Sequence, residues 1–135
     1  MSQTNTATRQ ILYVEDDSDD RIFLTESFSF EDANLVCAAD GQEAITYLHS
    51  IETSALPSLI ILDLNMPRWD GRQTLNYLKS HPQLSSIPVV ILSTSENKVD
   101  KLVCSRLGAA SYFEKPYHLE GYKEVVRNCI PLLKS

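Results

Sequence analysis

The stretch LIILD at residues 59 to 63 places four consecutive apolar side chains directly before an aspartate. A strand with one solvated face alternates apolar and polar residues, whereas a strand covered on both faces reads as a continuous apolar run. Four comparable stretches are ILYV (11–14), LVCA (35–38), VVIL (89–92) and SYFE (111–114). The sequence therefore predicts five short buried strands.

Segments with helical periodicity separate these strands. The last two have the longest apolar stripes, which consist of Val99, Leu102, Val103 and Leu107, and of Tyr122, Val125, Val126, Cys129, Ile130 and Leu133. Successive parallel strands need crossover connections, usually helices, and these cover both faces of the sheet. We therefore predict an α/β fold with an open, doubly wound parallel sheet. Residues 10–135 would form this single domain, and residues 1–9 a polar tail.

Composition excludes several other classes of protein. The 135 residues are 43% apolar and 22% charged, which is ordinary for a globular chain. No apolar run approaches the roughly 20 residues that span a bilayer, and the polar start of the chain does not resemble a signal peptide. The three cysteines show no metal-binding spacing and suit reduced thiols. We therefore expect a cytoplasmic protein that is not embedded in a membrane.

Charge is distributed unevenly along the chain. Residues 1–70 contain 13 acids and 3 bases, whereas residues 71–135 contain 5 acids and 9 bases, and the net charge is -6. Nucleic acids are bound through clustered Lys and Arg, so the acidic surplus argues against such a ligand. The excess acid instead favours a cation.

Polar side chains follow four of the predicted strands. They are Glu15 and Asp16, Asp63, Ser93 and Thr94, and Lys115. In doubly wound sheets, ligands bind at the carboxyl ends of the strands, so we expect these residues to converge in one cleft. The remaining acids of VEDDSDD (14–20), which are Asp17, Asp19 and Asp20, are predicted to cap a helix or lie on its surface.

The residue types at these strand ends suit phosphoryl chemistry. Three converging carboxylates repel one another unless a cation neutralises them, and oxygen ligands without His or Cys favour Mg²⁺. An aspartate can also attack phosphorus, while a lysine and a serine can donate hydrogen bonds to phosphoryl oxygens. Asp63, Lys115 and Ser93 are our candidates for these roles.

The chain resembles the receiver domain of two-component response regulators from about Ile11 to Leu133. The resemblance rests on four motifs in order, which are ILYVEDD, LIILDLNMPRWDG, IPVVILSTS and SYFEKPY. It implies a flavodoxin-like (βα)5 fold with strand order 2-1-3-4-5. Because these motifs span nearly the whole sequence, we expect a stand-alone receiver. Two longer stretches, HPQLSSIPVVILSTS and VDKLVCSRLGAASYFEKP, are similar to regulators that partner phytochrome-type kinases.

The resemblance also assigns roles to individual residues. Asp63 would be the phosphoacceptor, and Mg²⁺ would be held by Glu15, Asp16, Asp63 and the backbone carbonyl of Asn65. Ser93 would be the switch hydroxyl, Lys115 the phosphoryl-binding lysine and Tyr112 the switch aromatic. A cis bond between Lys115 and Pro116 is a further implication of the resemblance.

Three positions depart from the commonest family pattern. Glu15 stands where Asp is more usual, so the resemblance leaves open whether it binds metal directly or through water. Ser93 replaces the commoner Thr and keeps the hydroxyl. Thr94 fills a position that is often Ala or Gly, and its bulk predicts restricted access to Asp63 and slow phosphorylation by small donors.

A receiver of this kind would accept its phosphoryl group from a sensor histidine kinase or a phosphotransfer protein. The fourth helix, fifth strand and fifth helix would present the changed surface to an unknown downstream protein, and the last apolar stripe leaves room for a homodimer. Catalysis would be limited to self-phosphorylation and slow self-dephosphorylation. The alternatives are a magnesium-dependent aspartyl phosphohydrolase, a phosphorylation-independent interaction module, and a flavin-binding domain. Asn65 disfavours the first, because it stands where many such enzymes need an acid.

Overall fold

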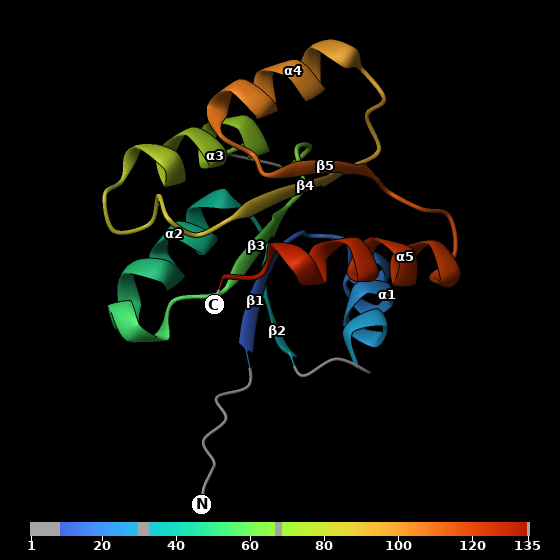
Figure 1. Cartoon of the computed structure of the whole chain (residues 1–135), viewed down its shortest axis with the longest axis horizontal. Helices are drawn as coiled ribbons and strands as arrows, with labels where there is room; N and C mark the ends of the chain where they lie inside the picture. Colours follow the sequence, from blue (N-terminus) through green and yellow to red (C-terminus); the bar gives the residue numbers. More distant parts are fainter. Residues whose placement is uncertain (1–8, 30–32, 67–68, 135) are drawn as a thin grey trace, which may run out of the picture.

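The computed structural model describes residues 9–29, 33–66 and 69–134, and within them it contains one parallel sheet (Figure 1). The strands are β1 (Arg9–Val14), β2 (Ala33–Ala38), β3 (Leu59–Leu62), β4 (Val89–Ser93) and β5 (Ser111–Glu114). Their order is β2-β1-β3-β4-β5, and every neighbouring pair is parallel. The predicted sheet and strand order are therefore confirmed.

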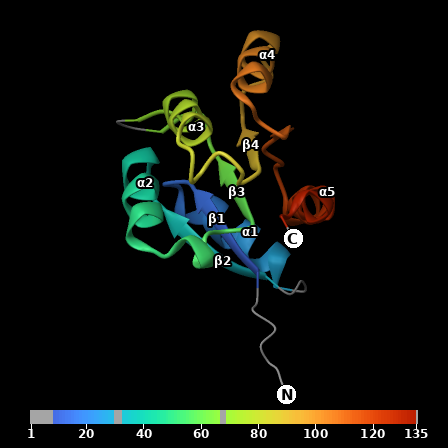
Figure 2. The same ribbon diagram turned by 60° about the vertical axis from the view of Figure 1, so that its left-hand side comes forward.

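In the described part of the chain, five α-helices connect or follow the strands. They are α1 (Ser18–Phe28), α2 (Gly41–Ser50), α3 (Gly71–Ser80), α4 (Lys98–Leu107) and α5 (Leu119–Cys129). Two short 3-10 helices are η1 (Thr53–Ala55) and η2 (Ile130–Leu132). Figure 2 shows α1 and α5 on one face of the sheet and α2 and α3 on the other. This is the doubly wound arrangement that the alternation of strands and helices predicts.

The central strand β3 is apolar throughout because it is covered on both faces of the sheet. All four of its side chains are completely buried, and they divide between two core clusters, one on each face of the sheet. Ile60 and Leu62 join the cluster under α2 and α3, whereas Leu59 and Ile61 join the cluster under α1 and α5. β1 and β2 begin two residues earlier than predicted, because polar residues near their starts still form ladder pairs, such as Gln10 with Asn34.

Helix ends follow recognisable local signals. Asp17 caps α1 by accepting a hydrogen bond from the backbone N–H of Asp19, as predicted. Gly108 ends α4 with a φ of 108°, the left-handed conformation that glycine adopts without strain. At Gly71, a Cβ atom would lie 2.5 Å from the carbonyl oxygen of Asp63, so only glycine lets α3 begin this close to the end of β3.

One expectation from the resemblance is not met. Among the described residues there is no cis peptide bond, so the Lys115–Pro116 bond is trans. The trans form of an X-Pro bond is favoured by only about 0.5–1 kcal/mol, so the surrounding structure decides which isomer forms.

No described helix is long and apolar enough to cross a bilayer. The cytoplasmic location and the boundary between tail and domain stay predictions.

Candidate functional site

The backbone ladder brings four strand ends together at one edge of the sheet. Leu62 of β3 is paired with Val14 of β1 and with Ile91 of β4. Beyond the strands, the N–H of Asp63 donates to the Val14 carbonyl at 3.2 Å, and the N–H of Lys115 donates to the Ser93 carbonyl at 2.8 Å. Each candidate side chain therefore lies within a residue or two of a paired strand position, and this pairing fixes its backbone.

Three carboxylates meet at this edge. Glu15, Asp16 and Asp63 each offer an oxygen atom, and these atoms lie within 4.8 Å of one another. Glu15 and Asp63 are buried, whereas Asp16 is exposed. Burial raises the pKa of the Asp63 carboxyl, against the opposing effect of Lys115, and burial likewise raises the pKa of Glu15. A cluster that is this costly to ionise, and that offers only oxygen, fits a hard divalent cation such as Mg²⁺.

Lys115 supplies the positive charge of the site. Its Nζ atom lies 2.6 Å from Oε1 of Glu15, 2.7 Å from Oδ2 of Asp20 and 3.6 Å from Oδ2 of Asp63. Burial lowers its pKa, but the hydrogen bonds to Asp20 and Glu15 outweigh this effect, and the net pKa is raised. The lysine is therefore a permanent cation, held closer to two neighbouring acids than to Asp63.

Glu15 is the most heavily bonded of the acids. Its Oε1 atom also accepts a hydrogen bond from the buried Tyr13 hydroxyl at 3.2 Å, and its Oε2 atom accepts one from the backbone N–H of Asp17 at 3.2 Å. Both of its oxygen atoms thus have protein donors. Asp63 accepts a hydrogen bond from the backbone N–H of Asn65 at 3.3 Å.

The loop after β4 carries the remaining candidates. Ser93 is completely buried, and its hydroxyl accepts a hydrogen bond from the backbone N–H of Ser95 at 3.1 Å, while Thr94 is exposed. The hydroxyl of Tyr112 donates to the Ser95 carbonyl at 2.9 Å. The Ser95 hydroxyl in turn donates to Asp100 of α4 at 2.7 Å. Tyr112 and α4 are therefore both bonded to the loop that presents Ser93.

Asp20 lies in the site, whereas the sequence predicts a helix cap or a surface position for it. Its Oδ2 atom contacts Lys115, and its Oδ1 atom accepts a hydrogen bond from the Tyr122 hydroxyl at 3.0 Å. A signal was available, because a helix that begins at Ser18, directly after β1, must place its first turn at the edge where the strands end. The participation of Tyr122 had no such signal, since its spacing indicates only a core position.

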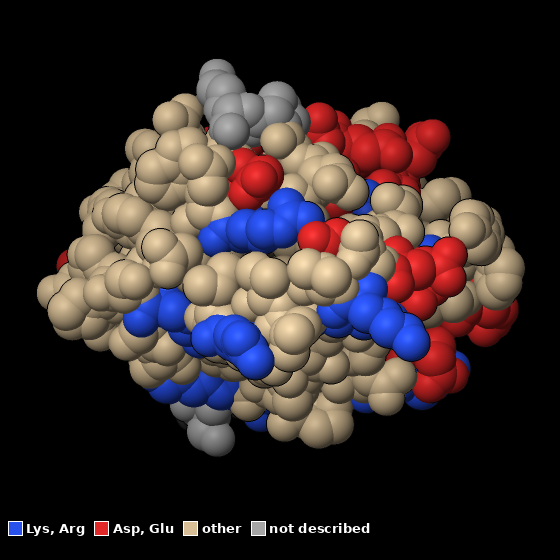
Figure 3. Space-filling view, turned by 90° about the horizontal axis from the view of Figure 1, so that it is seen from above, with Lys and Arg blue, Asp and Glu red and all other residues tan. Residues whose placement is uncertain are grey.

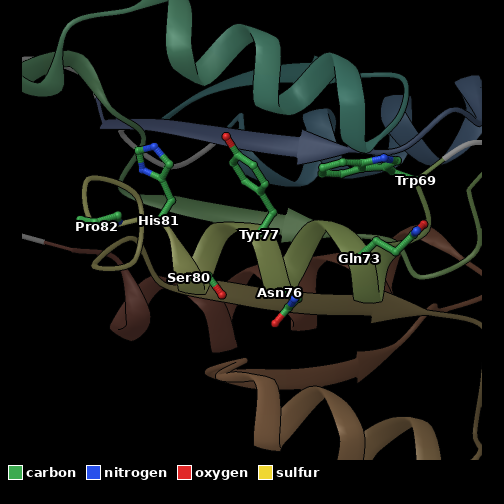
Figure 4. A pocket seen from close by; sticks show the side chains of 7 residues that line it. All are labelled: Trp69, Gln73, Asn76, Tyr77, Ser80, His81 and Pro82. Atoms are coloured by element: carbon green, nitrogen blue, oxygen red, sulfur yellow. The ribbon is translucent and has the colours of Figure 1, made fainter.

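A separate surface groove of about 450 Å³ lies along α3 (Figure 4). It is lined by the rings of Trp69, Tyr77 and His81, and by Gln73, Asn76 and Ser80. The Trp69 and Tyr77 ring centroids are 5.6 Å apart, and Tyr77 and His81 are stacked at 5.8 Å. The groove contains none of the predicted site residues, and no polar group in it matches the chemistry of the acidic cluster.

A doubly wound sheet with an acidic cluster, a lysine and a buried hydroxyl at its carboxyl edge is the arrangement expected of a receiver domain. The chain belongs to the family described as the response regulator receiver domain, which it matches over residues 11–127.

Relatives in sequence and structure agree with this family. The response regulator Rcp1 of Synechocystis is 36% identical over 132 residues, which cover 94% of this chain and 90% of Rcp1. A crystal structure of the Mn(2+)-bound form of Rcp1 has a TM-score of 0.80 at 33% identity, and covers 90% of this chain and 91% of its own. The phosphorylated cyanobacterial phytochrome response regulator RcpA has a TM-score of 0.81 at 37% identity, with the same coverage.

Longer regulators match only in part. The Regulator of RpoS of Escherichia coli is 34% identical over 123 residues, which cover 90% of this chain but 35% of that protein. This chain therefore corresponds to nearly all of Rcp1 and to about a third of the longer regulator.

Proposed function

We propose that this chain is a phosphorylated switch of a two-component system, with Asp63 as the phosphoacceptor. The observation that carries the proposal is the position of the Asp63 carboxylate, which lies within 4.8 Å of two other acids and 3.6 Å from the Lys115 ammonium. Carboxylates at this spacing can hold a divalent cation, and the lysine can pair with an incoming phosphoryl oxygen.

In the proposed reaction, an Oδ atom of Asp63 attacks the phosphorus of a phosphohistidine on a histidine kinase or phosphotransfer protein. The new P–O bond forms as the P–N bond breaks, and the electron pair of that bond stays on the imidazole nitrogen. Lys115 and the Ser93 hydroxyl donate hydrogen bonds to the phosphoryl oxygens. A Mg²⁺ ion, when bound, neutralises part of the phosphoryl charge. The lack of an acidic side chain at Asn65 restricts later hydrolysis to a slow reaction.

Within the acid set, we propose that Asp16 and Asp63 bind Mg²⁺ through side-chain oxygens and that the Asn65 carbonyl adds a ligand. Glu15 would act through water, because both of its oxygen atoms already have protein donors. We thus propose water-mediated rather than direct metal binding for Glu15, the position where Asp is more usual.

The readout surface would be α4, β5 and α5. When Ser93 turns to the phosphoryl group, the Ser95 backbone moves with it, and both Tyr112 and Asp100 lose or change their bonds to that residue.

The readout surface carries three exposed or half-exposed cations of α4, which are Lys98, Lys101 and Arg106. Figure 3, which views the molecule from above Figure 1, shows Lys and Arg side chains scattered over this side and Asp and Glu side chains gathered toward its upper and right parts, so the cations would serve as local contacts for acidic groups of a partner. A phytochrome-type kinase is the proposed donor, because the RcpA structure is that of a phytochrome response regulator. A homodimer stays a prediction.

Trp69 is the only tryptophan and follows Asp63 by six residues in the sequence, so its fluorescence provides a test. We expect its fluorescence to change when Mg²⁺ and then beryllofluoride, a phosphoryl mimic, are added. We also expect acetyl phosphate to add one phosphoryl group to the protein, as measured by intact mass. Both responses to phosphoryl compounds should disappear in Asp63→Asn. A wild-type protein that responds to neither Mg²⁺ nor beryllofluoride contradicts the proposal, and multiple turnovers of a phosphate ester would indicate the hydrolase instead.

The exposed Thr94 side chain gives a second test. If its bulk restricts access to Asp63, Thr94→Ala should raise the rate of phosphorylation by acetyl phosphate, followed by intact mass over time. Thr94→Val, which keeps the bulk and removes the hydroxyl, is the matched control and should leave the rate near that of the wild type. An unchanged rate in Thr94→Ala removes the proposed role of Thr94.

A further inference from the structure

Lys115 is bound more closely by Asp20 than by the proposed phosphoacceptor. The Nζ atom lies 2.7 Å from Asp20 and 3.6 Å from Asp63, and the lysine side chain is only 10% exposed. An ammonium has three N–H donors. Glu15 and Asp20 take up two of these donors at hydrogen-bond distance, and they restrain the position of the ammonium while its third N–H serves an oxygen arriving at Asp63.

Asp20 also connects this lysine to α5. One carboxylate oxygen faces Lys115, and the other accepts the hydrogen bond from the Tyr122 hydroxyl at 3.0 Å. Tyr122 is 1% exposed, and its ring packs against Phe23 of α1 with centroids 5.5 Å apart. A buried hydroxyl that loses its partner carries a desolvation cost, so Tyr122 holds Asp20 in place and responds to its movement.

We propose that Asp20 is a positioning residue that competes with the phosphoryl group on Asp63 for Lys115 and, through Tyr122, couples the position of Lys115 to α5. This inference rests on the proposed function. In the unphosphorylated protein, Asp20 holds the ammonium toward α1 and α5. A phosphoryl group draws the ammonium toward Asp63, which leaves Asp20 with the Tyr122 hydroxyl as its remaining side-chain donor among the residues that the structure describes. The Asp20 to Tyr122 bond then changes, and α5 reports the state of the site.

The first test compares two aspartates of the same helix turn. Asp19 is exposed and carries the same charge as Asp20, one residue away. Beryllofluoride affinity at saturating Mg²⁺ is measured through Trp69 fluorescence in the wild type, Asp20→Asn and Asp19→Asn. We expect Asp20→Asn to bind roughly three- to tenfold more tightly, because a competing charged hydrogen bond is weakened. Asp19→Asn should stay within about twofold of the wild type, since charge alone is largely screened at its exposed position.

The outcomes distinguish a failure of the proposed function from a failure of the proposed competition by Asp20. A wild-type protein that does not bind beryllofluoride overturns the proposed function. A wild-type protein that binds, with Asp20→Asn behaving like Asp19→Asn or binding more weakly, overturns the competition alone. Thermal unfolding of each variant verifies that it is folded, and should Asp20→Asn be unfolded, the decision rests on the Tyr122 variant described next.

The second test concerns the link to α5. Tyr122→Phe keeps the ring and removes the hydroxyl that holds Asp20. We expect a smaller gain in beryllofluoride affinity, about twofold, and no further gain when it is combined with Asp20→Asn. Backbone amide NMR gives a readout that a purely structural role would not change. The beryllofluoride-induced shifts of Val125 and Val126 should shrink in both variants while those of Ser93 and Lys115 persist. Unchanged shifts in α5 contradict the coupling.

Discussion

α4 and α5 have apolar stripes of similar spacing in the sequence, yet the fold treats them in opposite ways. α5 buries Tyr122, Val125, Val126 and Cys129 against the sheet and α1. In α4, all of whose residues are described, only Cys104 is buried, while Val99 is 64% exposed and Leu102 is 52% exposed. An apolar stripe therefore predicts a helix, but it does not predict how firmly that helix is attached.

Polar contacts take the place of apolar burial in α4. Asp100 accepts hydrogen bonds from Arg72 of α3 and from Ser95 of the preceding loop, and Lys101 lies over the Tyr112 ring at 5.6 Å. Exposed charged contacts contribute roughly 0.2–1 kcal/mol each, which is less than burial of one large aliphatic side chain. α4, the helix next to the Ser93 loop, is thus less firmly held than α5 and can move at lower cost, as the proposed switch requires.

The largest expected effect tests this contrast with a matched pair of valines. Val126 of α5 is 2% exposed and Val99 of α4 is 64% exposed. Val126→Ala should lower the free energy of unfolding by about 2 kcal/mol, through lost burial and a cavity. Val99→Ala should change it by less than about 0.5 kcal/mol. Urea unfolding of both variants measures the difference, and equal losses would mean that α4 is packed as firmly as α5.

Much of the fold could be predicted because the strands are apolar and parallel. A continuous apolar run such as LIIL predicts a strand covered on both faces, and all four of its side chains are buried. Because ligands bind at the carboxyl ends of such strands, the sequence also predicts that Asp63, Lys115 and Ser93 lie at one edge. The exposure of Val99 and Leu102 could not be predicted, because periodicity records where apolar side chains lie on a helix but not whether a neighbour covers them. The position of Asp20 depends on where α5 presents Tyr122, which is a tertiary relation.

The next effect concerns the two buried thiols, one in each helix. Cys104 and Cys129 are both fully buried, and burial raises the pKa of the Cys104 thiol and raises that of Cys129 to about 12. A thiol reagent reaches either one only when the helix opens locally. We expect Cys104 to react roughly tenfold faster than Cys129, because α4 opens more readily.

The thiol measurement needs one cysteine per protein. Cys37 is half-buried and is replaced by Ser in both variants, together with either Cys104 or Cys129. Labelling by a chromogenic disulfide is followed under native conditions and again in urea, where both thiols should react at the same rate. Equal native rates would show that the two helices open together, and a faster Cys129 would reverse the comparison.

The smallest effect concerns the ion pair between Arg72 of α3 and Asp100 of α4. Hydrogen bonds from Arg72, and next from Ser95, lower the pKa of the Asp100 carboxyl. An acid with a lowered folded pKa stabilises the protein above its unfolded pKa of about 3.9, and this contribution is lost as the pH falls through the folded value. Arg72→Met should therefore destabilise the protein at pH 7 by about 0.5 kcal/mol, since both side chains are partly exposed.

The stability difference between wild type and Arg72→Met should depend on pH. Urea unfolding of wild type and Arg72→Met should give stabilities that differ at pH 7, begin to converge below about pH 4, and meet only once the pH is below the lowered pKa of Asp100 in the folded wild type. Arg106→Met removes an exposed cation from α4 for which no acidic partner is found in the described part of the chain, and its small effect should not depend on Asp100. A difference between wild type and Arg72→Met that persists at low pH would mean that Arg72 holds α4 by packing of its aliphatic stem. In that case α4 would be attached to α3 by apolar contact after all, and the contrast with α5 would be one of degree.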